Sequence, residues 1–245
     1  MIKAITFDFW YTLYKSKPVK LEERLQFLKR AIEDRSQAEL AMERVESAVD
    51  IAREAWNLAW INEQRTMGAA EWLSMVLRGL DITLQPDDQT QIELELENTI
   101  LHNLPILVEE AKVVLPVLAA RYPLAIISDT GLTPGRVLYQ VLEQDELLGY
   151  FSHFTFSDQL GSSKPHPNNF LTTLQALGAG PQEAVHIGDL LRTDIAGAKQ
   201  VGMRAVQYVG LNHDQTEADI IPDAVIRSHV ELEPLLQGWN NGLVN

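Results

Sequence analysis

The sequence predicts an α/β fold that has a Rossmann-like, three-layer core with a parallel sheet and an inserted all-helical domain. Short β-type runs alternate with helical periods along most of the chain, which is the pattern of a parallel sheet with helices on both faces. After the first predicted strand the β signal disappears for a long stretch in which helical periods recur. An apolar content of 46% in 245 residues suits a core of ordinary size plus an insertion.

Six apolar runs predict the strands of the sheet: residues 4–9, 124–128, 153–156, 184–187, 204–209 and 224–226. Several of these runs end at or next to a polar residue. Ligands of open α/β sheets bind beyond the carboxyl ends of the strands. We therefore expect Asp8, Ser128 and Asp189 to converge at that edge of the sheet.

The stretch from Tyr14 to about Val108 predicts four or five helices. Apolar residues recur there at helical spacing along a single stripe: Met42, Val45, Val49, Ala52, Trp56, Ala59 and Trp60. Pro86 predicts a helix start, and Pro105 predicts the return to the sheet. We therefore expect two domains, a core of residues 1–14 and 109–245 and a helical domain of residues 15–108.

Composition narrows the classes of partner. The net charge of −14, from 34 acidic and 20 basic residues, argues against nucleic acid or an anionic membrane as the main partner. The lack of cysteine excludes disulfides, thiolate chemistry and cysteine-ligated zinc. The start of the sequence has no signal-type apolar region, and no stretch reaches the ~20 apolar residues of a membrane span. We expect a cytoplasmic protein, either monomer or homodimer.

The first two candidate sites follow predicted strands. Asp8 lies at the end of the first apolar run, in AITFDFWYTL, and Thr12 comes four residues later in the following loop. Ser128 ends the run of LAIISDTG and offers a hydroxyl and backbone N–H groups to an oxyanion. Taken alone, an Asp in such a place is most simply a turn residue, and a Ser is most simply a cap.

Two further candidate sites lie nearer the C-terminus. Lys164 precedes Pro165 in GSSKPHP, and the proline restricts the backbone of the lysine. In HIGDLLRTDIAGAKQVGM, Asp189 follows a strand and a glycine, and Asp194 comes five residues later at or near a helix start. A lone Lys-Pro pair is usually a surface turn, and Asp194 alone is most simply an N-cap. The four sites together, in this order, are harder to explain by structure alone.

As a set, the four motifs resemble those of the haloacid dehalogenase superfamily, whose members are mostly phosphatases. The resemblance rests on FDFWYTL, ISDT, the Lys-Pro of SKPHP, and HIGDLLRTD with the trailing IAGAKQVGM. It covers roughly residues 1–14 and 109–240. It implies a haloacid dehalogenase-like core, and it implies that the helical domain is the cap that this superfamily carries between its first and second motifs.

The resemblance also implies chemistry for these positions. Asp8 would attack phosphorus and form an aspartyl-phosphate that water then hydrolyses. The implied catalytic residues are Asp8, Thr12, Ser128 and Lys164. The implied Mg²⁺ ligands are the Asp8 carboxylate, the backbone carbonyl of Trp10 and the Asp189 carboxylate. Asp194 would orient the water ligands or Lys164. The expected substrate is a small phosphorylated metabolite, over which the cap would close.

Trp10 departs from the phosphatase pattern. In phosphatases of the family this position is a second Asp that protonates the leaving group and later activates water. Its loss removes general acid–base catalysis, which is typically worth roughly 100- to 10,000-fold. We therefore expect a weak phosphatase that prefers aryl or acyl phosphates, whose leaving groups need no proton. Asp129 and His166 are possible substitutes for the acid, but a turn and a surface position are the simpler interpretations.

Two other functions are compatible with Trp10. The 2-haloacid dehalogenases of the family also carry an aromatic residue at this position and work without metal. They have a Ser- and Asn-rich motif, however, where this sequence has the metal-binding Asp189. The second alternative is a degenerate member that binds a ligand and turns over little. Trp56, Trp60 and Trp72 would then form a binding surface, although their helical spacing favours a place in the core of the cap.

Overall fold

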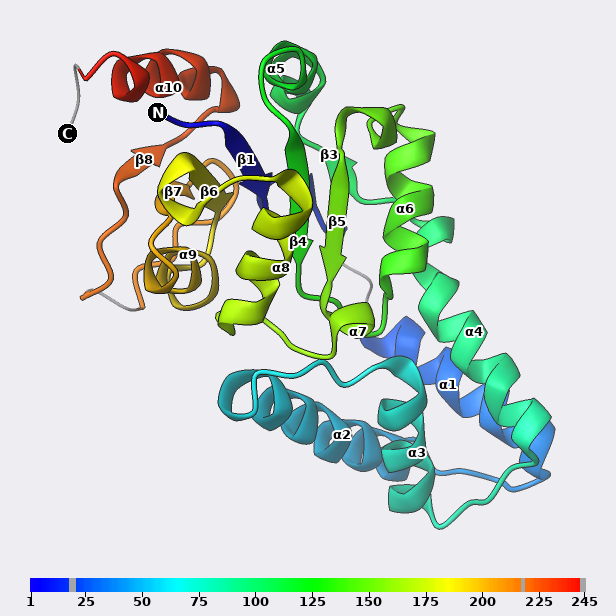
Figure 1. The fold of residues 1–245 in the computed structure, drawn as a ribbon. Coiled ribbons are helices and arrows are strands. Elements are labelled where there is room, and N and C mark those ends of the chain that lie inside the picture. Colours follow the sequence, from blue (N-terminus) through cyan, green and yellow to red (C-terminus); the bar gives the residue numbers. More distant parts are fainter. Residues whose placement is uncertain (18–20, 217–218, 243–245) are drawn as a thin grey trace.

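The computed structural model describes residues 1–17, 21–216 and 219–242. A sheet of six strands lies at its centre, in the order β5-β4-β1-β6-β7-β8, and every neighbouring pair is parallel (Figure 1). The strands are β1 (Ala4–Phe7), β4 (Leu124–Ser128), β5 (His153–Phe156), β6 (Ala184–Gly188), β7 (Arg204–Tyr208) and β8 (Ala224–Ile226). The predicted α/β class and parallel sheet are confirmed.

The predicted strand positions are correct to within two residues, and β1 shows why one boundary is wrong. The prediction extended this strand to Phe9, but the strand ends at Phe7. The backbone N–H groups of Leu13 and Tyr14 both donate to the carbonyl of Phe9, at 3.0 and 2.9 Å, so the chain turns back immediately after Asp8. The apolar character of Phe9 reflects packing in the core rather than strand pairing, because its ring stacks on Tyr14 with centroids 4.5 Å apart.

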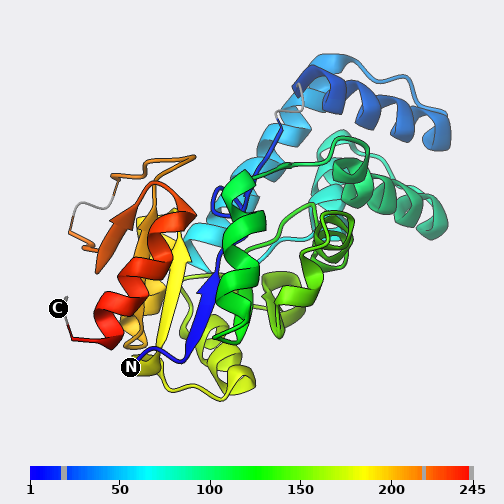
Figure 2. The ribbon, with the colours of Figure 1, turned by 90° about the horizontal axis from the view of Figure 1, so that it is seen from above.

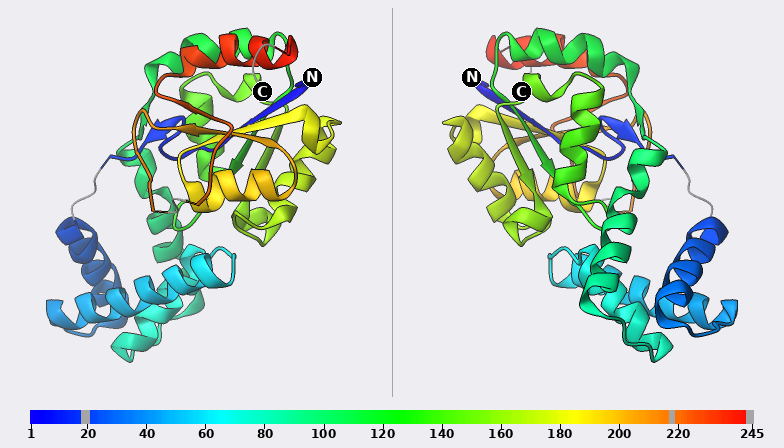
Figure 3. Two further views of the ribbon diagram at one scale, coloured as in Figure 1. Left: turned by 90° about the vertical axis from the view of Figure 1, so that its left-hand side faces the viewer. Right: turned by 90° about the vertical axis from the view of Figure 1, so that its right-hand side faces the viewer.

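Helices cover both faces of the sheet and form three layers (Figure 3). The side chains on one face of the sheet pack against α5 (Glu109–Ala119), α6 (Gly135–Gln144) and α10 (Leu232–Asn240). The other face, which includes Ala4, Ala184 and Ala205, packs against α8 (Pro167–Leu177) and α9 (Ala196–Gln200). The remaining short helical elements are α7 (Ser157–Leu160), η1 (Leu148–Tyr150), η2 (Pro181–Glu183), η3 (Leu191–Ile195) and η4 (His229–Glu231).

The inserted segment is helical, as predicted, and has a hydrophobic core of its own. It contains α1 (Leu21–Ser36), α2 (Met42–Asn62), α3 (Ala69–Leu80) and α4 (Pro86–His102), and Pro86 is the first residue of its helix. Leu28, Ile32, Val45, Leu73 and Ile92 are completely buried in this second core. The segment projects to one side of the sheet domain (Figure 2). None of the helices in the described ranges has the length and apolarity of a membrane span.

A short ribbon that the sequence did not predict connects the two parts of the chain. Strand β2 (Tyr14–Lys15) pairs antiparallel with β3 (Ile106–Leu107), so that the chain enters and leaves the insertion at the same place. The N–H of Val108 also donates to the carbonyl of Leu13 at 2.9 Å. Two-residue strands are too short to show alternation, which explains why sequence periodicity missed them.

His229 is a buried histidine in the wall of the sheet core. Its side chain stacks on Tyr208 with centroids 4.4 Å apart, and neither ring nitrogen has a hydrogen-bond partner among the described residues. Burial lowers its pKa from 6.5 to about 4, against a weaker opposing effect of Glu110. The imidazole is therefore neutral in the folded protein at neutral pH.

This neutral histidine predicts a loss of stability in mild acid. In the unfolded chain His229 binds a proton near pH 6.5, whereas in the folded protein it does so only near pH 4. The free energy of unfolding therefore falls as the pH drops between these two values. The expected loss between pH 7 and pH 5 is roughly 2 kcal/mol. His229→Phe keeps a stacked ring and should remove this part of the pH dependence, as measured by urea unfolding of both proteins at the two pH values. Identical pH dependence in the two proteins would contradict the assignment.

Candidate functional site

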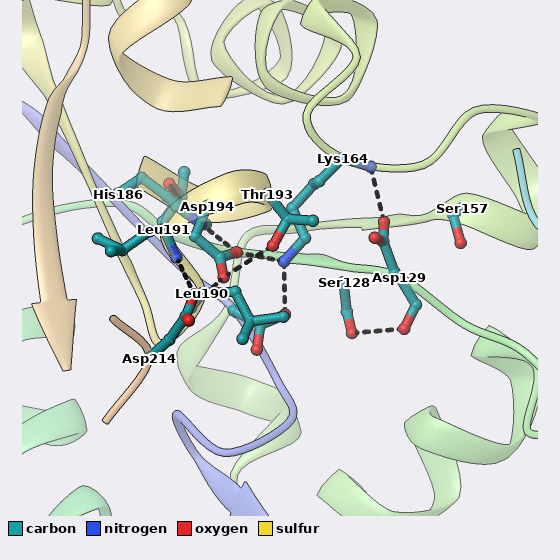
Figure 4. Close-up of polar contacts among 12 residues, drawn as sticks. Ser128, Asp129, Ser157, Lys164, His186, Leu190, Leu191, Thr193, Asp194 and Asp214 are labelled. Atoms are coloured by element: carbon teal, nitrogen blue, oxygen red, sulfur yellow. Dashed lines mark hydrogen bonds and ion pairs between the residues drawn. The ribbon is translucent and has the colours of Figure 1, made fainter. Parts of the chain in front are cut away.

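A buried lysine joins two carboxylates at the carboxyl edge of the sheet. The Nζ atom of Lys164 lies 2.6 Å from Asp8 Oδ1 and 2.5 Å from Asp194 Oδ1. All three side chains are at most 7% exposed. Asp8 is held at the end of β1 because its backbone N–H donates to the carbonyl of Ile187 in β6, at 2.8 Å. Figure 4 shows Lys164 extending from its own loop toward Asp194.

Asp194 is positioned by the turn η3, which follows β6. Its Oδ2 atom accepts hydrogen bonds from the backbone N–H of Leu190, at 3.0 Å, and from the hydroxyl of Thr193, at 3.3 Å. The carboxylate lies against Gly188, where a Cβ atom would come within 2.3 Å of Asp194 Cγ. The glycine of the HIGD motif is therefore required by close approach, because any larger residue would displace the acid that binds Lys164.

His186 and Thr6 extend this network behind Asp194. They are paired residues of β6 and β1, and both side chains are completely buried. His186 Nε2 lies 3.1 Å from Asp194 Oδ1, and its Nδ1 atom lies 2.8 Å from the Thr6 hydroxyl. Burial lowers the pKa of His186, so the ring is neutral. Because the ionised Asp194 only accepts hydrogen bonds, Nε2 carries the proton and the Thr6 hydroxyl donates to Nδ1.

Asp189 completes a group of three carboxylates with Asp8 and Asp194. One oxygen of each lies within 4.8 Å of the others, and all three residues are buried. The Asp189 Oδ2 atom accepts a hydrogen bond from the side-chain amide of Asn212 at 2.8 Å. Three closely spaced carboxylates offer the hard oxygen ligands that Mg²⁺ prefers.

Burial and mutual charge shift the pKa values of this group in different directions. Burial raises the pKa of Asp8 well above its ordinary value, against the effect of Lys164. Burial and the charge of Asp194 raise the pKa of Asp189 to about 7. Although burial alone would raise it, Lys164 and His186 hold the pKa of Asp194 below its usual range. Burial opposes the charge of Lys164 too, but Asp194 and Asp8 raise its pKa, so the ammonium stays charged.

A cavity of about 380 Å³ opens above this group. Asp8, Lys164, Asp189 and Asp194 line it. Four aromatic side chains from the loop after β1 and from α2 also line it: Trp10, Tyr11, Trp56 and Trp60. A small molecule held here therefore contacts both the carboxylate group and aromatic rings.

The three tryptophans of the inserted segment do not share one role. Trp72 is only 5% exposed within the core of the insertion, as its helical spacing predicted. Trp56 and Trp60 line the cavity, where their rings stack with centroids 5.5 Å apart, and Trp56 also packs against the core of the insertion. The predicted place in the core therefore holds for Trp72 and in part for Trp56, whereas Trp60 lines the cavity.

Ser128 and Thr12 do not line the cavity. The Ser128 hydroxyl donates to the backbone carbonyl of Asp129 at 3.2 Å (Figure 4). Thr12 is completely buried, and its hydroxyl has no hydrogen-bond partner in the described parts of the chain. The structure thus brings four of the predicted side chains together, Asp8, Lys164, Asp189 and Asp194, and places these two outside the cavity wall.

Asp129 connects the two parts of the chain at the cavity. Its Oδ2 atom accepts from the indole N–H of Trp60 at 2.8 Å, and its Oδ1 atom accepts from the backbone N–H of Lys164 at 2.8 Å. A second contact joins the N–H of Ser163 to the carbonyl of Gln64 at 2.7 Å. The loop that carries Lys164 is therefore bonded directly to the segment after α2, and through Asp129 to α2 itself.

Sequence reasoning missed four residues of the site. Asn212 follows β7, so its position at the carboxyl end of a strand was a usable signal. His186 and Thr6 lie inside strands, where alternation only indicates that one face is less apolar. Arg192 lies with its guanidinium carbon 4.3 Å from the ring centroid of Trp60, a contact between η3 and the insertion. No local pattern predicts that contact.

The comparison with protein families agrees with this geometry. A family model described as haloacid dehalogenase-like hydrolase matches residues 2–202. The chain belongs to this family. The superfamily resemblance of the four motifs is thereby confirmed, and the protein is a haloacid dehalogenase-like hydrolase.

Curated relatives of this hydrolase match over part of their length. A glyceraldehyde 3-phosphate phosphatase of Pyrococcus abyssi is 34% identical over 133 residues, which are 54% of this chain and 55% of the relative. A phosphoglycolate phosphatase of Nitrosococcus oceani is 32% identical over 99 residues, 40% of this chain and 44% of the relative. The chain thus spans about half of these relatives.

Solved structures similar to this hydrolase include both branches of the family. A 2-haloacid dehalogenase of Pseudomonas syringae pv. Tomato has a TM-score of 0.74 and 27% identity, over 98% of this chain and all of that one (100%). A phosphatase of Thermococcus onnurineus has a TM-score of 0.61 and 26% identity, over 97% and 99% of the two chains. These matches confirm the fold, including the inserted segment, but they do not distinguish the two reactions.

The close approach at Gly188 predicts a large effect of a single methyl group. Gly188→Ala should displace the Asp194 carboxylate and lower the free energy of unfolding by about 1–3 kcal/mol, the usual range for overpacking. Gly149→Ala is the control, because a Cβ atom there meets nothing within 4 Å. Its unfolding free energy should change by less than about 1 kcal/mol. Equal urea midpoints for the two variants would contradict the packing argument.

Proposed function

We propose that the protein is a Mg²⁺-dependent phosphatase of small phosphorylated molecules that works through an aspartyl-phosphate on Asp8. The observation that carries the proposal is the contact of the Lys164 ammonium with Asp8 in a buried group of three carboxylates. A nucleophilic carboxylate beside a fixed cation suits attack on a phosphoryl group. The names of the partial relatives, which are phosphatases, support the same reaction class.

The residues at this site fit a magnesium ion. Asp8 and Asp189 supply carboxylate oxygens, the backbone carbonyl of Trp10 is the third proposed ligand, and all three are oxygen donors of the kind that Mg²⁺ takes. Burial, together with the neighbouring carboxylates, raises the pKa values of Asp8 and Asp189. Bound Mg²⁺ would neutralise charge on the phosphoryl oxygens and on the attacking carboxylate.

The residues of the chain account for the two chemical steps. The Asp8 carboxylate attacks phosphorus, a new O–P bond forms, and the ester O–P bond breaks with its electron pair leaving on the alcohol oxygen. Water then attacks phosphorus and releases inorganic phosphate and free Asp8. Lys164 remains charged and lowers the repulsion between the carboxylate and the phosphoryl oxygens, while Asp194 holds the ammonium in place. Ser128 and Thr12 would support the loops from outside the cavity wall.

Residues 15–108 act as the cap in this proposal. Its helix α2 places Trp56 and Trp60 over the end of the cavity, and the Trp60–Asp129 hydrogen bond ties it to the loop of Lys164. A cap that touches the phosphate-binding loops excludes bulk water from the aspartyl-phosphate until the leaving group has departed.

Asp129 and His166, the two candidate substitutes for the missing acid, make other hydrogen bonds. Both oxygens of Asp129 accept N–H hydrogen bonds, from Trp60 and Lys164. His166 is exposed, and its Nδ1 atom accepts from the N–H of Asn168 at the start of α8. We therefore assign the acid role to neither residue, and the leaving group departs without a proton.

The nucleophile and the metal are tested together. Wild-type protein with Mg²⁺ should release phosphate from phenyl phosphate, and both EDTA and Asp8→Asn should abolish the release, because each removes a partner of the transferred phosphoryl group. Phosphate is measured colorimetrically, with halide release from 2-chloropropionate followed in parallel. Phosphate release that survives Asp8→Asn would contradict the proposal.

The same assay tests the second candidate, a metal-independent 2-haloacid dehalogenase. It is favoured by the solved 2-haloacid dehalogenase that matches the full chain, and by the aromatic residue at position 10. Halide release in EDTA would establish this reaction. Absence of both phosphate release and halide release would favour a protein that binds a ligand in the cavity without turnover.

Trp10 predicts dependence on the leaving group. Wild-type protein should hydrolyse phenyl phosphate much faster than an alkyl phosphate such as 2-phenylethyl phosphate, because an alkoxide needs a proton. Trp10→Asp should raise kcat on the alkyl ester by about 100-fold or more over Trp10→Asn, a variant of similar size without an acid. Equal rates of the two variants would show that position 10 does not limit the reaction.

A further inference from the structure

Two further cavities share the indole of Trp10 with the cavity that contains Asp8. One has a volume of about 530 Å³, and Trp10, Trp56 and Gly131 line both it and the Asp8 cavity. The other is about 150 Å³ and shares Trp10, Arg24 and Leu132 with the 530 Å³ cavity. The three hollows therefore meet around Trp10, and a substrate that extends past this ring enters the 530 Å³ cavity.

These two additional cavities carry basic residues in an acidic protein. Arg24 and Arg53 line the larger one, Arg24 and Lys17 line the smaller one, and neither has an Asp or Glu among its described lining residues. The chain has a net charge of −14, so cavities whose charged lining residues are all basic differ from its overall composition. The cavity beside Arg30 also contains Asp34 and Glu95, which shows that basic residues elsewhere on the same helix are accompanied by acids.

Arg24 has no partner in the described parts of the chain. Within residues 1–17, 21–216 and 219–242 neither Arg24 nor Lys17 makes a hydrogen bond or an ion pair, whereas Arg53 pairs with Asp50 at 2.9 Å. Arg24 lines both cavities, and Lys17 lines only the smaller one. Arg35, on the same helix, pairs with Glu95 at 3.1 Å. The Arg24 side chain is exposed, and an arginine remains charged at neutral pH. An unpaired guanidinium beside a cavity is suited to a carboxylate or another anion.

The walls between Asp8 and Arg24 suit a flat group. Trp10 packs edge-on against Phe9, with centroids 4.9 Å apart, and Trp56 stacks on Trp60. A Cβ atom at Gly131 would lie 3.4 Å from the Trp56 ring, an ordinary van der Waals contact, so the indole lies against the loop after β4. Aromatic rings bind well against such surfaces, through burial and stacking. An aromatic leaving group also needs no proton, in agreement with the missing acid at position 10.

We propose that the substrate is an aryl phosphate whose ring carries a second anionic group, and that Arg24 binds this group in the cavity beyond Trp10. The inference rests on the proposed phosphatase function and names the substrate class for the same site. Asp8 and Lys164 take the phosphoryl end, the indoles of Trp10 and Trp56 flank the ring, and Arg24 takes the distal anion. Arg24 acts in binding and has no part in the bond-breaking steps.

The test compares 3-carboxyphenyl phosphate with 3-carbamoylphenyl phosphate, which have nearly the same size and differ in the charge of one group. Wild-type kcat/KM should be about tenfold higher for the carboxylate, mainly through KM, since a hydrogen bond to a charged group is worth that factor. Arg24→Gln should bring the ratio close to one, mainly by raising KM for the carboxylate ester, whereas Arg24→Lys should keep part of the preference. Arg30→Gln, on the same helix but outside these cavities, should keep the wild-type ratio.

Binding gives a readout that does not depend on turnover. Calorimetric titration of Asp8→Asn with each ester, in the presence of Mg²⁺, should show the same tenfold preference and its loss when Arg24→Gln is added. A ratio near one in the wild type, with Asp8-dependent hydrolysis of both esters, would overturn the inference and leave the phosphatase proposal standing. A carboxylate preference in binding without any hydrolysis would overturn the phosphatase proposal and keep the anion site. No binding of either ester would overturn both.

Discussion

The buried ammonium of Lys164 is the interaction on which the whole site depends. It joins Asp8 and Asp194, from which it is separated by 156 and 30 residues in sequence. Buried ions are costly unless they are paired and hydrogen-bonded, so each of these groups needs the others in place. The end of β1, the loop after β5 and the turn after β6 must therefore form together, and the parallel order that places β1 beside β6 makes this possible.

The groups around this pair prepare it for chemistry by controlling charge. Asp194 is surrounded by donors, from Lys164, His186, the Leu190 N–H and Thr193, and these donors keep it ionised. Asp8 lacks such a set, and burial raises its pKa. The site thus contains one carboxylate that is fully satisfied and serves as support, and one that is left short of positive charge. In the proposed phosphatase, a cation and a phosphoryl group would supply the partners that this second carboxylate lacks.

The chemistry of position 10 changes the shape of the cavity as well as its acid–base capacity. Trp10, two residues after Asp8, lines three cavities. Helix α2 of the insertion adds Trp56 and Trp60 to the wall of the Asp8 cavity. In the proposed phosphatase, the lack of an acid at position 10 and the aromatic walls favour the same leaving groups, which are flat and stable as anions. Trp60 donates to Asp129, which also accepts from the backbone N–H of Lys164.

The sequence by itself determined the α/β class, the six strands, the helical insertion and the family, because these follow from local periodicity and from motifs at strand ends. Asp8 and Asp189 were expected at one edge because parallel strands bring their carboxyl ends together, and Lys164 and Asp194 were expected from the resemblance of the motifs. The tertiary structure alone decided that Trp56 and Trp60 line the Asp8 cavity, that Ser128 and Thr12 do not, and that Arg24 has no partner among the described residues. Those outcomes depend on how the insertion packs against the sheet domain, and contacts between segments far apart in sequence leave no local pattern.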